Sequence, residues 1–170
     1  RSGRQRQMCI RDRQYGADAV RYWAASARLG TDTTYDENVF LVGNKLVTKM
    51  YNAAKFVLSH DSYQINKLNE IDASFLKDLE EMVNNVTTYY EKFQFAQALQ
   101  ITEEFFWNTY TDNYRELVKK RVFNSDGDDK ASAVTCLRLG LSVILRLLAP
   151  VLPTITEEIW KRILSNMPFF

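Results

Sequence analysis

The 170-residue chain is predicted to fold as an all-α bundle of about six helices, and three observations support this prediction. Apolar residues recur every three to four positions along most of the chain, as they do on one face of an α-helix. The chain has only three prolines and six glycines, which is too few for a fold of many short strands and turns. Apolar residues make up 46% and charged residues 25%, as in an ordinary globular domain.

The first two helices are expected on either side of a polar loop. In residues 15–27, YGADAVRYWAASA, alanine and valine recur at helical spacing. Gly30 and the following TDTTYDE run predict that a loop interrupts the helical pattern. Asp36 can then cap a second helix, which continues to about Ser59 without an internal proline.

Two further helical regions follow the polar loop HDSYQINKLNE. Asp72 is expected to cap a helix from about Ala73 to Lys92, because an apolar face begins directly after it. Residues 93–124 form a long helical region, and a break is expected near 109–112, where Thr and Asp are weak helix formers.

The last two helices are the most clearly bounded. NSDGDDK is a loop, and the apolar helix after it is expected to run from Asp129 to Ala149 and to end before Pro150. The final helix is expected to begin in PTITEEIWKRIL, where Thr154 and Glu157 have the spacing of a capping box.

Residues 1–13, RSGRQRQMCIRDR, show no periodicity and are set apart from the fold. The string resembles a translated sequencing-library adapter, so the segment is interpreted as non-native, with a disordered basic arm as the alternative. The whole chain carries a net charge of +1 and this segment +4, so the remaining 157 residues carry −3. RNA binding would therefore need a local basic patch, because the overall charge does not favour it.

The composition argues against catalysis, metal binding and membrane insertion. His60 is the only histidine, and the two cysteines, Cys9 and Cys136, indicate neither a disulfide framework nor a metal cluster. The most apolar run, residues 137–152, is broken by two arginines and a proline, so no membrane span is expected. A cytoplasmic monomer without a catalytic or metal site is the expectation.

The second predicted helix carries the most informative surface. On a helical wheel, residues 38–58 form a broad apolar face, and the opposite side carries Lys45, Lys49 and Asn52. Phe56 falls in the middle of that polar side, and Lys55 lies at its edge. Aromatic rings can stack on bases, lysines bind phosphates and asparagine can pair with a base edge, so this side is a candidate RNA-binding surface. The alternative is that Phe56 packs under a neighbouring helix and that the lysines are simply solvated.

Five motifs in order resemble class I aminoacyl-tRNA synthetases, specifically their valyl branch. The similarity covers residues 15 to about 162. YGADAVR resembles the segment after the family's KMSKS-type loop, and GTDTTYDENVF resembles the connection into the helical domain. The others are KMYNAAKFVL (49–58), EEFFWNTYTDNYRELVK (103–119) and LRLLAPVLPTITEEIW (145–160).

The resemblance implies a helical domain that binds the anticodon arm of tRNA(Val). It places anticodon contacts at Lys49, Asn52, Lys55 and Phe56, and Lys45 is added by helix geometry alone. Two alternatives stay open: the same domain of an isoleucyl or leucyl enzyme, and a helical protein-interaction module without RNA binding. Other motif residues are expected to have structural roles. Of these, Trp107, Tyr110 and Tyr114 are assigned to the core, and Leu148, Ile159 and Trp160 to closing the bundle. Asp18 and Arg21 are assigned to seating a loop of the catalytic domain, and in the isolated fragment they would only cap and pair.

The resemblance also implies a division of the chain. Residues 14–36 would connect from the catalytic domain, and residues 37–170 would form a C-terminally truncated anticodon-binding domain. The sequence has no HIGH-type or KMSKS-type signature and no nucleotide-binding pattern. The fragment is therefore expected to catalyse nothing and to need no cofactor, whereas the parent enzyme would use ATP with magnesium to attach valine to tRNA.

Overall fold

The computed structural model describes residues 14–27, 30, 36–61 and 65–165, and the regular secondary structure in these residues is entirely helical. The elements are α2 (Ala17–Ser26), α3 (Glu37–Leu58), α4 (Glu70–Glu91), α5 (Phe95–Glu104), the π-helix η1 (Phe105–Tyr114), α6 (Arg115–Asn124), α7 (Gly127–Leu148) and α8 (Pro153–Ser165). Because α5, η1 and α6 follow one another without a gap, they form one long arm. The predicted all-α bundle of about six helices is confirmed.

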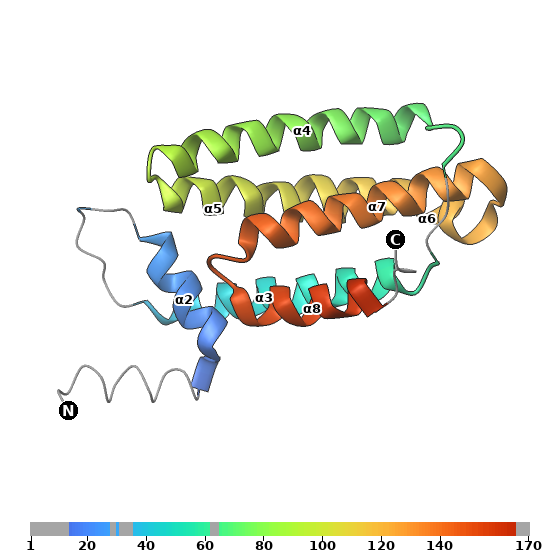
Figure 1. The fold of residues 1–170 in the computed structure, drawn as a ribbon. Coiled ribbons are helices and arrows are strands. Elements are labelled where there is room, and N and C mark those ends of the chain that lie inside the picture. The colour runs from blue at the N-terminus through green and yellow to red at the C-terminus, as the bar shows by residue number, and fades with distance from the viewer. Residues whose placement is uncertain (1–13, 28–29, 31–35, 62–64, 166–170) are drawn as a thin grey trace.

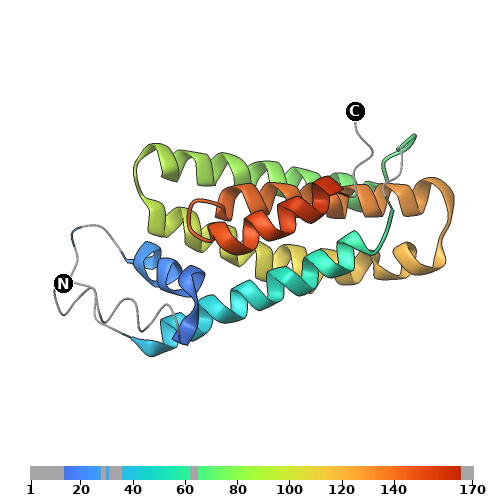
Figure 2. The ribbon, with the colours of Figure 1, turned by 60° about the horizontal axis from the view of Figure 1, so that its bottom comes forward.

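The helix α7 lies at the centre of this bundle. It packs against α3, α4, α5, α6 and α8. Figure 1 shows α4 and the α5–η1–α6 arm on one side of α7, and α3 with α8 on the other. The short helix α2 crosses the end of the bundle and packs on α3 (Figures 1 and 2).

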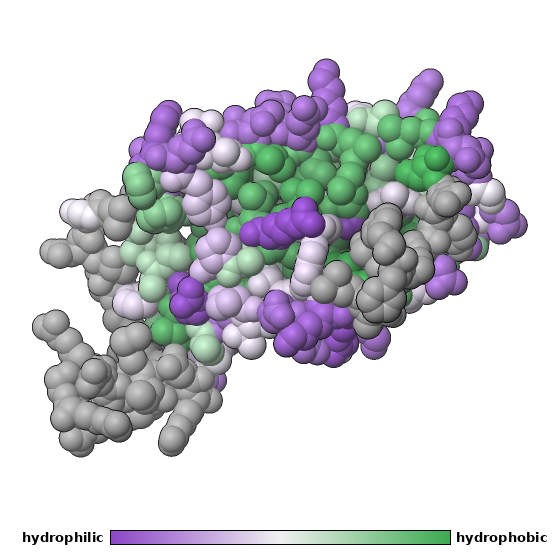
Figure 3. Space-filling model, viewed as in Figure 1, coloured by the Kyte–Doolittle hydropathy of each residue, from purple (hydrophilic) through white to green (hydrophobic). Residues whose placement is uncertain are grey.

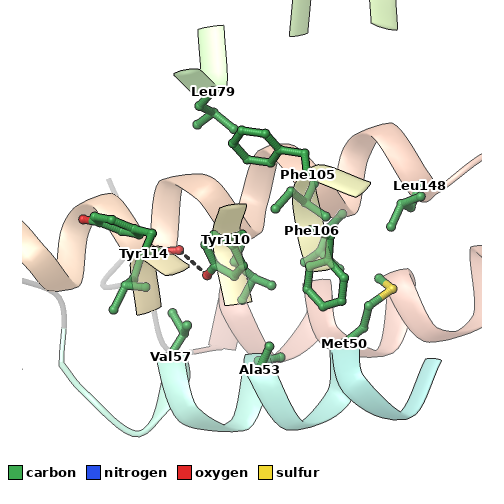
Figure 4. Packing of buried hydrophobic residues seen from close by; sticks show 14 of the residues in the cluster. Met50, Ala53, Val57, Leu79, Phe105, Phe106, Tyr110, Tyr114 and Leu148 are labelled. Carbon is green, nitrogen blue, oxygen red and sulfur yellow. Dashed lines mark hydrogen bonds between the residues drawn. The ribbon is translucent and has the colours of Figure 1, made fainter. Parts of the chain in front are cut away.

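The core joins α3 to the arm. Met50, Ala53 and Val57 of α3 are essentially inaccessible and face Phe106 and Tyr110 (Figure 4). The Tyr110 hydroxyl donates a hydrogen bond to the Leu137 carbonyl on α7 at 2.7 Å, and burial raises the pKa of Tyr110. The predicted core positions of Tyr110 and Tyr114 are confirmed.

The apolar composition of α7 is explained by this central place. By length and composition alone, α7 could cross a membrane, but 61% of its most apolar window is buried inside the bundle. Figure 3 shows that apolar residues also gather on the face over α4 and α7. Both helices carry half-exposed apolar side chains, among them Ile71 and Leu139.

Two of the predicted helix caps are wrong. Asp36 caps α3 as expected, since its carboxylate accepts a hydrogen bond from the Asn38 amide at 2.9 Å. The cap of α4 is Asn69, not Asp72, and Asp72 lies buried in the first turn. The start of α8 is capped from another helix, because Asp18 accepts hydrogen bonds from two backbone amides there instead of a Thr154–Glu157 box.

Asp18 and Arg21 tie α2 to the connection between α7 and α8. The Asp18 carboxylate accepts from the amides of Thr154 and Ile155 at 3.1 and 2.8 Å. Arg21 donates to the carbonyl oxygens of Pro150 and Val151 at 2.7 and 3.1 Å. The pair therefore caps α8 and holds α2 on the bundle, which is the role expected of it in an isolated fragment. The seating of a catalytic-domain loop stays a prediction.

The expected break in the arm is also wrong. The helix continues through residues 109–112, but residues 105–114 adopt π-helical turns with i→i+5 hydrogen bonds. The residues that were expected to end the helix widen it instead.

A buried network around Asp72 joins α4, the arm and α7. The Asp72 side chain is fully buried and accepts hydrogen bonds from Ser132 and, at 2.7 Å, from the Tyr114 hydroxyl. Arg121 donates to both Asp72 oxygens and also to Asp129. Every partner of this carboxylate comes from another element.

Replacing Asp72 with Asn is expected to lower the free energy of unfolding by about 3 kcal/mol, because the half-buried Arg121 loses its main counter-charge. Urea denaturation followed by circular dichroism measures this. Asp78→Asn on the exposed side of α4 is the matched control and should change stability by less than about 0.5 kcal/mol. Equal effects of the two substitutions would contradict the assigned role of the network.

Candidate nucleic-acid interface

One face of α3 is left uncovered by the bundle. The apolar stripe of α3 turns toward the core, so helix geometry sends Leu41, Lys45, Thr48 and Asn52 to the outside, at spacings of four, three and four. All four residues are exposed. The sequence therefore places a continuous row of exposed side chains, polar except for Leu41, along about three turns of one helix.

This row forms one wall of an open groove of about 500 Å³ between α3 and η1. The groove is lined by Leu41, Asn44, Lys45, Thr48, Lys49, Asn52 and Trp107. Trp107 is the residue from η1, so the groove exists only because the arm packs beside α3. The lining combines an aromatic face, amide groups and two cations, which suits an unstacked base and its phosphate.

Lys49 is fixed at the edge of this groove by two residues of η1. Its Nζ lies 2.8 Å from Oδ1 of Asp112 and 3.8 Å from the centroid of the Trp107 ring. The hydrogen bond from Lys49 lowers the pKa of the Asp112 carboxyl group. Asp112 faces outward with 61% of its side chain exposed, whereas the Lys49 side chain is only 22% exposed.

The assignment of Trp107 to the core is therefore only partly correct. One side of Trp107 packs against the core cluster, and its Nε1 donates to Glu103 at 3.2 Å. Its ring also carries the Lys49 ammonium and forms part of the groove wall. The sequence pattern identified Trp107 as a large apolar residue. It could not show that one face of the Trp107 ring lines the groove.

The other predicted lysines are placed differently from Lys49. Lys45 and Lys55 are exposed, and within the described residues neither has a recorded ion pair. Lys45 lines the groove, and Lys55 lies in the last turn of α3 beyond it. These two side chains are available to external anions.

The helical wheel suggested that Phe56 is an exposed ring among lysines, but the structure shows otherwise. Phe56 is half-buried and packs edge-on against His60 and Phe123, with ring centroids 5.4 and 5.9 Å away. The Arg115 guanidinium lies 6.0 Å from its centroid. The alternative interpretation, that Phe56 packs against a neighbouring helix, is supported because α6 passes beside this end of α3. Its contact with RNA stays a prediction.

The helical wheel also missed three lining residues, although the signal was present. Leu41, Thr48 and Asn44 share the face of Lys45 and Asn52 by their spacing. Asp112 was missed for another reason, since its pairing with Lys49 spans 63 positions and depends on the packing of two helices. In the described part of the chain, no cluster of three or more His, Cys, Asp or Glu side chains could hold a metal ion.

More than half of the chain matches a known family. Residues 72–169 match the family described as the anticodon-binding domain of tRNA ligase. Since the match covers more than half of the chain, the chain belongs to this family. The core of the arm, the buried Asp72 network and the groove residue Trp107 all lie inside the matched region.

Curated proteins similar to this chain include valine–tRNA ligases, which confirms the expected resemblance to the valyl branch. The chain is 47% identical over 156 residues to the "Valine--tRNA ligase" of Wolbachia pipientis wMel, and 45% identical over 153 residues to that of Cutibacterium acnes. These alignments cover 89% and 87% of this chain but only 18% of each relative, so the chain spans about a fifth of their length.

A solved structure shares the fold. The methionyl-tRNA synthetase of Mycobacterium tuberculosis, in its free state, superposes with a TM-score of 0.69 at 17% identity. The match covers 92% of this chain and 34% of that chain. At this identity the likeness concerns the fold alone.

His60, which packs against Phe56, predicts a pH-dependent free energy of unfolding. Burial lowers the pKa of His60 below its ordinary 6.5, and the charges of Lys130 and Arg138 lower it further, against a smaller opposing effect of Asp61. The unfolded chain therefore takes up this proton first as the pH falls. The contribution of neutral His60 to the free energy of unfolding should be fully present above about pH 6.5. It should be lost as the pH falls through the pKa of His60 in the folded protein.

Because the chain has one histidine, a proton NMR titration of its ring measures this pKa directly. A midpoint clearly below 6.5 is expected. His60→Gln should flatten the difference in unfolding free energy between pH 7 and pH 5 relative to the original protein. A ring that titrates at or above 6.5 would contradict the assigned burial.

Proposed function

We propose that this chain binds the anticodon arm of tRNA(Val) through the exposed face of α3, as one part of a valine–tRNA ligase. The observation that carries the proposal is the groove between α3 and η1: its η1 wall, Trp107, lies inside the region that matches the anticodon-binding family, and α3 packs against α7 and α8 of that region. Lys45, Lys49, Asn52, Lys55 and Phe56 are the proposed contact residues. The relatives supply the choice of amino acid, since their names specify valine.

The contacts divide by chemistry. Lys45 and Lys55 are exposed and suited to phosphates, which position the arm without reading its sequence. Asn52 is exposed beside the groove, and its amide can donate to and accept from a base edge. Phe56 is half-buried beside the exposed Lys55, and its ring is the proposed stacking face for a loop base.

In the parent enzyme this domain would position the acceptor end of the tRNA at a catalytic domain in the rest of the protein. That domain would use ATP with magnesium to join valine to the tRNA. The described residues are proposed to contribute recognition and orientation and no bond-making step. They would do so in the cytoplasm and as part of a monomer.

Recognition is tested with the 170-residue chain and short RNA stem-loops that differ only at the third anticodon base, C for valine and U for isoleucine. Fluorescence anisotropy should show tighter binding of the valine stem-loop. Preference for the isoleucine base would support the isoleucyl alternative. Binding of neither RNA, at salt from 50 to 200 mM, would contradict the proposed function and favour the protein-interaction alternative.

Phe56→Leu is expected to weaken stem-loop binding about tenfold, because leucine keeps apolar volume but removes the stacking face, which contributes about 1–3 kcal/mol. Tyr51→Leu is the matched control, since this exposed ring lies on the same helix and is not one of the proposed contact residues. The melting temperature of both variants reports any loss of folding. Unchanged affinity of a folded Phe56→Leu variant would remove Phe56 from the interface.

A further inference from the structure

The geometry around Lys49 points to a role for Asp112 that goes beyond charge neutralisation. We propose that Asp112 is a positioning residue: it holds the Lys49 ammonium on the Trp107 ring, so that Lys49 donates to a base edge in the groove instead of binding a phosphate. This inference rests on the proposed function of the groove.

The first step is the number of donors that remain. A lysine ammonium has three N–H donors. One is directed at Oδ1 of Asp112, 2.8 Å away, and the ammonium sits on the indole face of Trp107 at 3.8 Å. Lys49 also lines the groove, so we infer that its remaining donor capacity is directed there. The Lys49 ammonium, which would otherwise have three free donors, is thus held in one position with only part of its donor capacity free.

The second step is charge. The attraction of Lys49 for a phosphate is reduced by a carboxylate at ion-pair distance, because a nearby phosphate would be repelled by Asp112. Lys45 lines the same groove and has no recorded ion pair within the described residues. Two lysines one helical turn apart thus offer different chemistry, a paired donor and an unpaired cation.

The third step is the π-helix, which makes the arrangement possible. In an α-helix, residues five apart point about 140° away from each other around the axis. The i→i+5 hydrogen bonds of η1 widen the turn, so residues five apart lie closer to one face. Trp107 and Asp112 are five apart, and both contact the same ammonium.

Asp112 and Trp107, the two contacts of Lys49, are each held by a hydrogen bond within the arm. Thr111 donates to Asp112 at 3.2 Å, and Trp107 donates to Glu103 at 3.2 Å, so both partners of Lys49 are themselves held by neighbouring side chains on the arm. Lys49 comes from α3 and meets an arrangement that the arm supplies.

Asp112→Asn tests the proposal in the 170-residue chain with the valine stem-loop as the probe. Asparagine keeps the shape but removes the charge, which leaves Lys49 free to bind a phosphate. The plot of log affinity against log salt should become steeper by about 0.7, the value of one further phosphate contact on single-stranded RNA. Discrimination between the C and U stem-loops should fall about fivefold.

Two further variants exclude a general electrostatic effect. Glu104→Gln removes a charge from the same arm without releasing a cation, because the recorded partner of Glu104 is the neutral Gln100. It should leave slope and discrimination unchanged. The double variant Lys49→Gln with Asp112→Asn should lose the added steepness, because the gain depends on Lys49.

The outcomes separate the two proposals. If the unmodified chain binds no stem-loop, the proposed function fails. If it binds, but Asp112→Asn keeps slope and discrimination, or Glu104→Gln changes them equally, then Asp112 has no positioning role and only this inference is overturned. The exposed position of Asp112 leaves folding intact in its variant, which circular dichroism verifies.

Discussion

The fully buried carboxylate of Asp72 is the constraint on which the placement of the arm depends. Removing a carboxylate from water is costly unless charge and hydrogen bonds compensate for it. Here the compensation comes from Tyr114 at the end of η1, Arg121 on α6 and Ser132 on α7. Because these partners belong to separate elements, any shift of the arm would leave a buried charge without partners. The network thus fixes one particular arrangement of α4, the arm and α7.

That arrangement also sets the geometry of the candidate interface between α3 and η1. Tyr114 closes the π-helix that carries Trp107 and Asp112, and its ring stacks on Phe75 of α4 with centroids 3.8 Å apart. Tyr110, one turn earlier, is fixed to α7 by its hydroxyl. The side of η1 that faces the core is therefore held at two points, which sets the distance between its opposite side and α3. The groove is a consequence of this spacing and needs no loop to form it.

The local sequence predicted the helices well because apolar periodicity and prolines act over a few residues. It also predicted which side of α3 stays outside, since one strong apolar stripe leaves only the opposite face. It failed where a side chain has a distant partner. Asp72 and Asp18 both looked like ordinary polar residues near helix starts, but Asp72 binds across 49 positions to Arg121 and Asp18 across 136 to Thr154. Capping rules consider only neighbours along the chain, so they could not anticipate either contact.

The same limit explains why the wheel treated the lysines of α3 as equivalent. Helical position distinguishes buried from exposed side chains but says nothing about what the adjacent helix presents. Weak helix formers at 109–112 suggested a break, whereas the helix continues there with wider, π-helical turns, and its core side contacts α4 and α7. Only that widening brings an indole face and a carboxylate to one ammonium. The exposed side of α3 thus includes one lysine whose charge is already paired. In a domain whose net charge without residues 1–13 is −3, we propose that this pairing favours a particular RNA loop over phosphate in general.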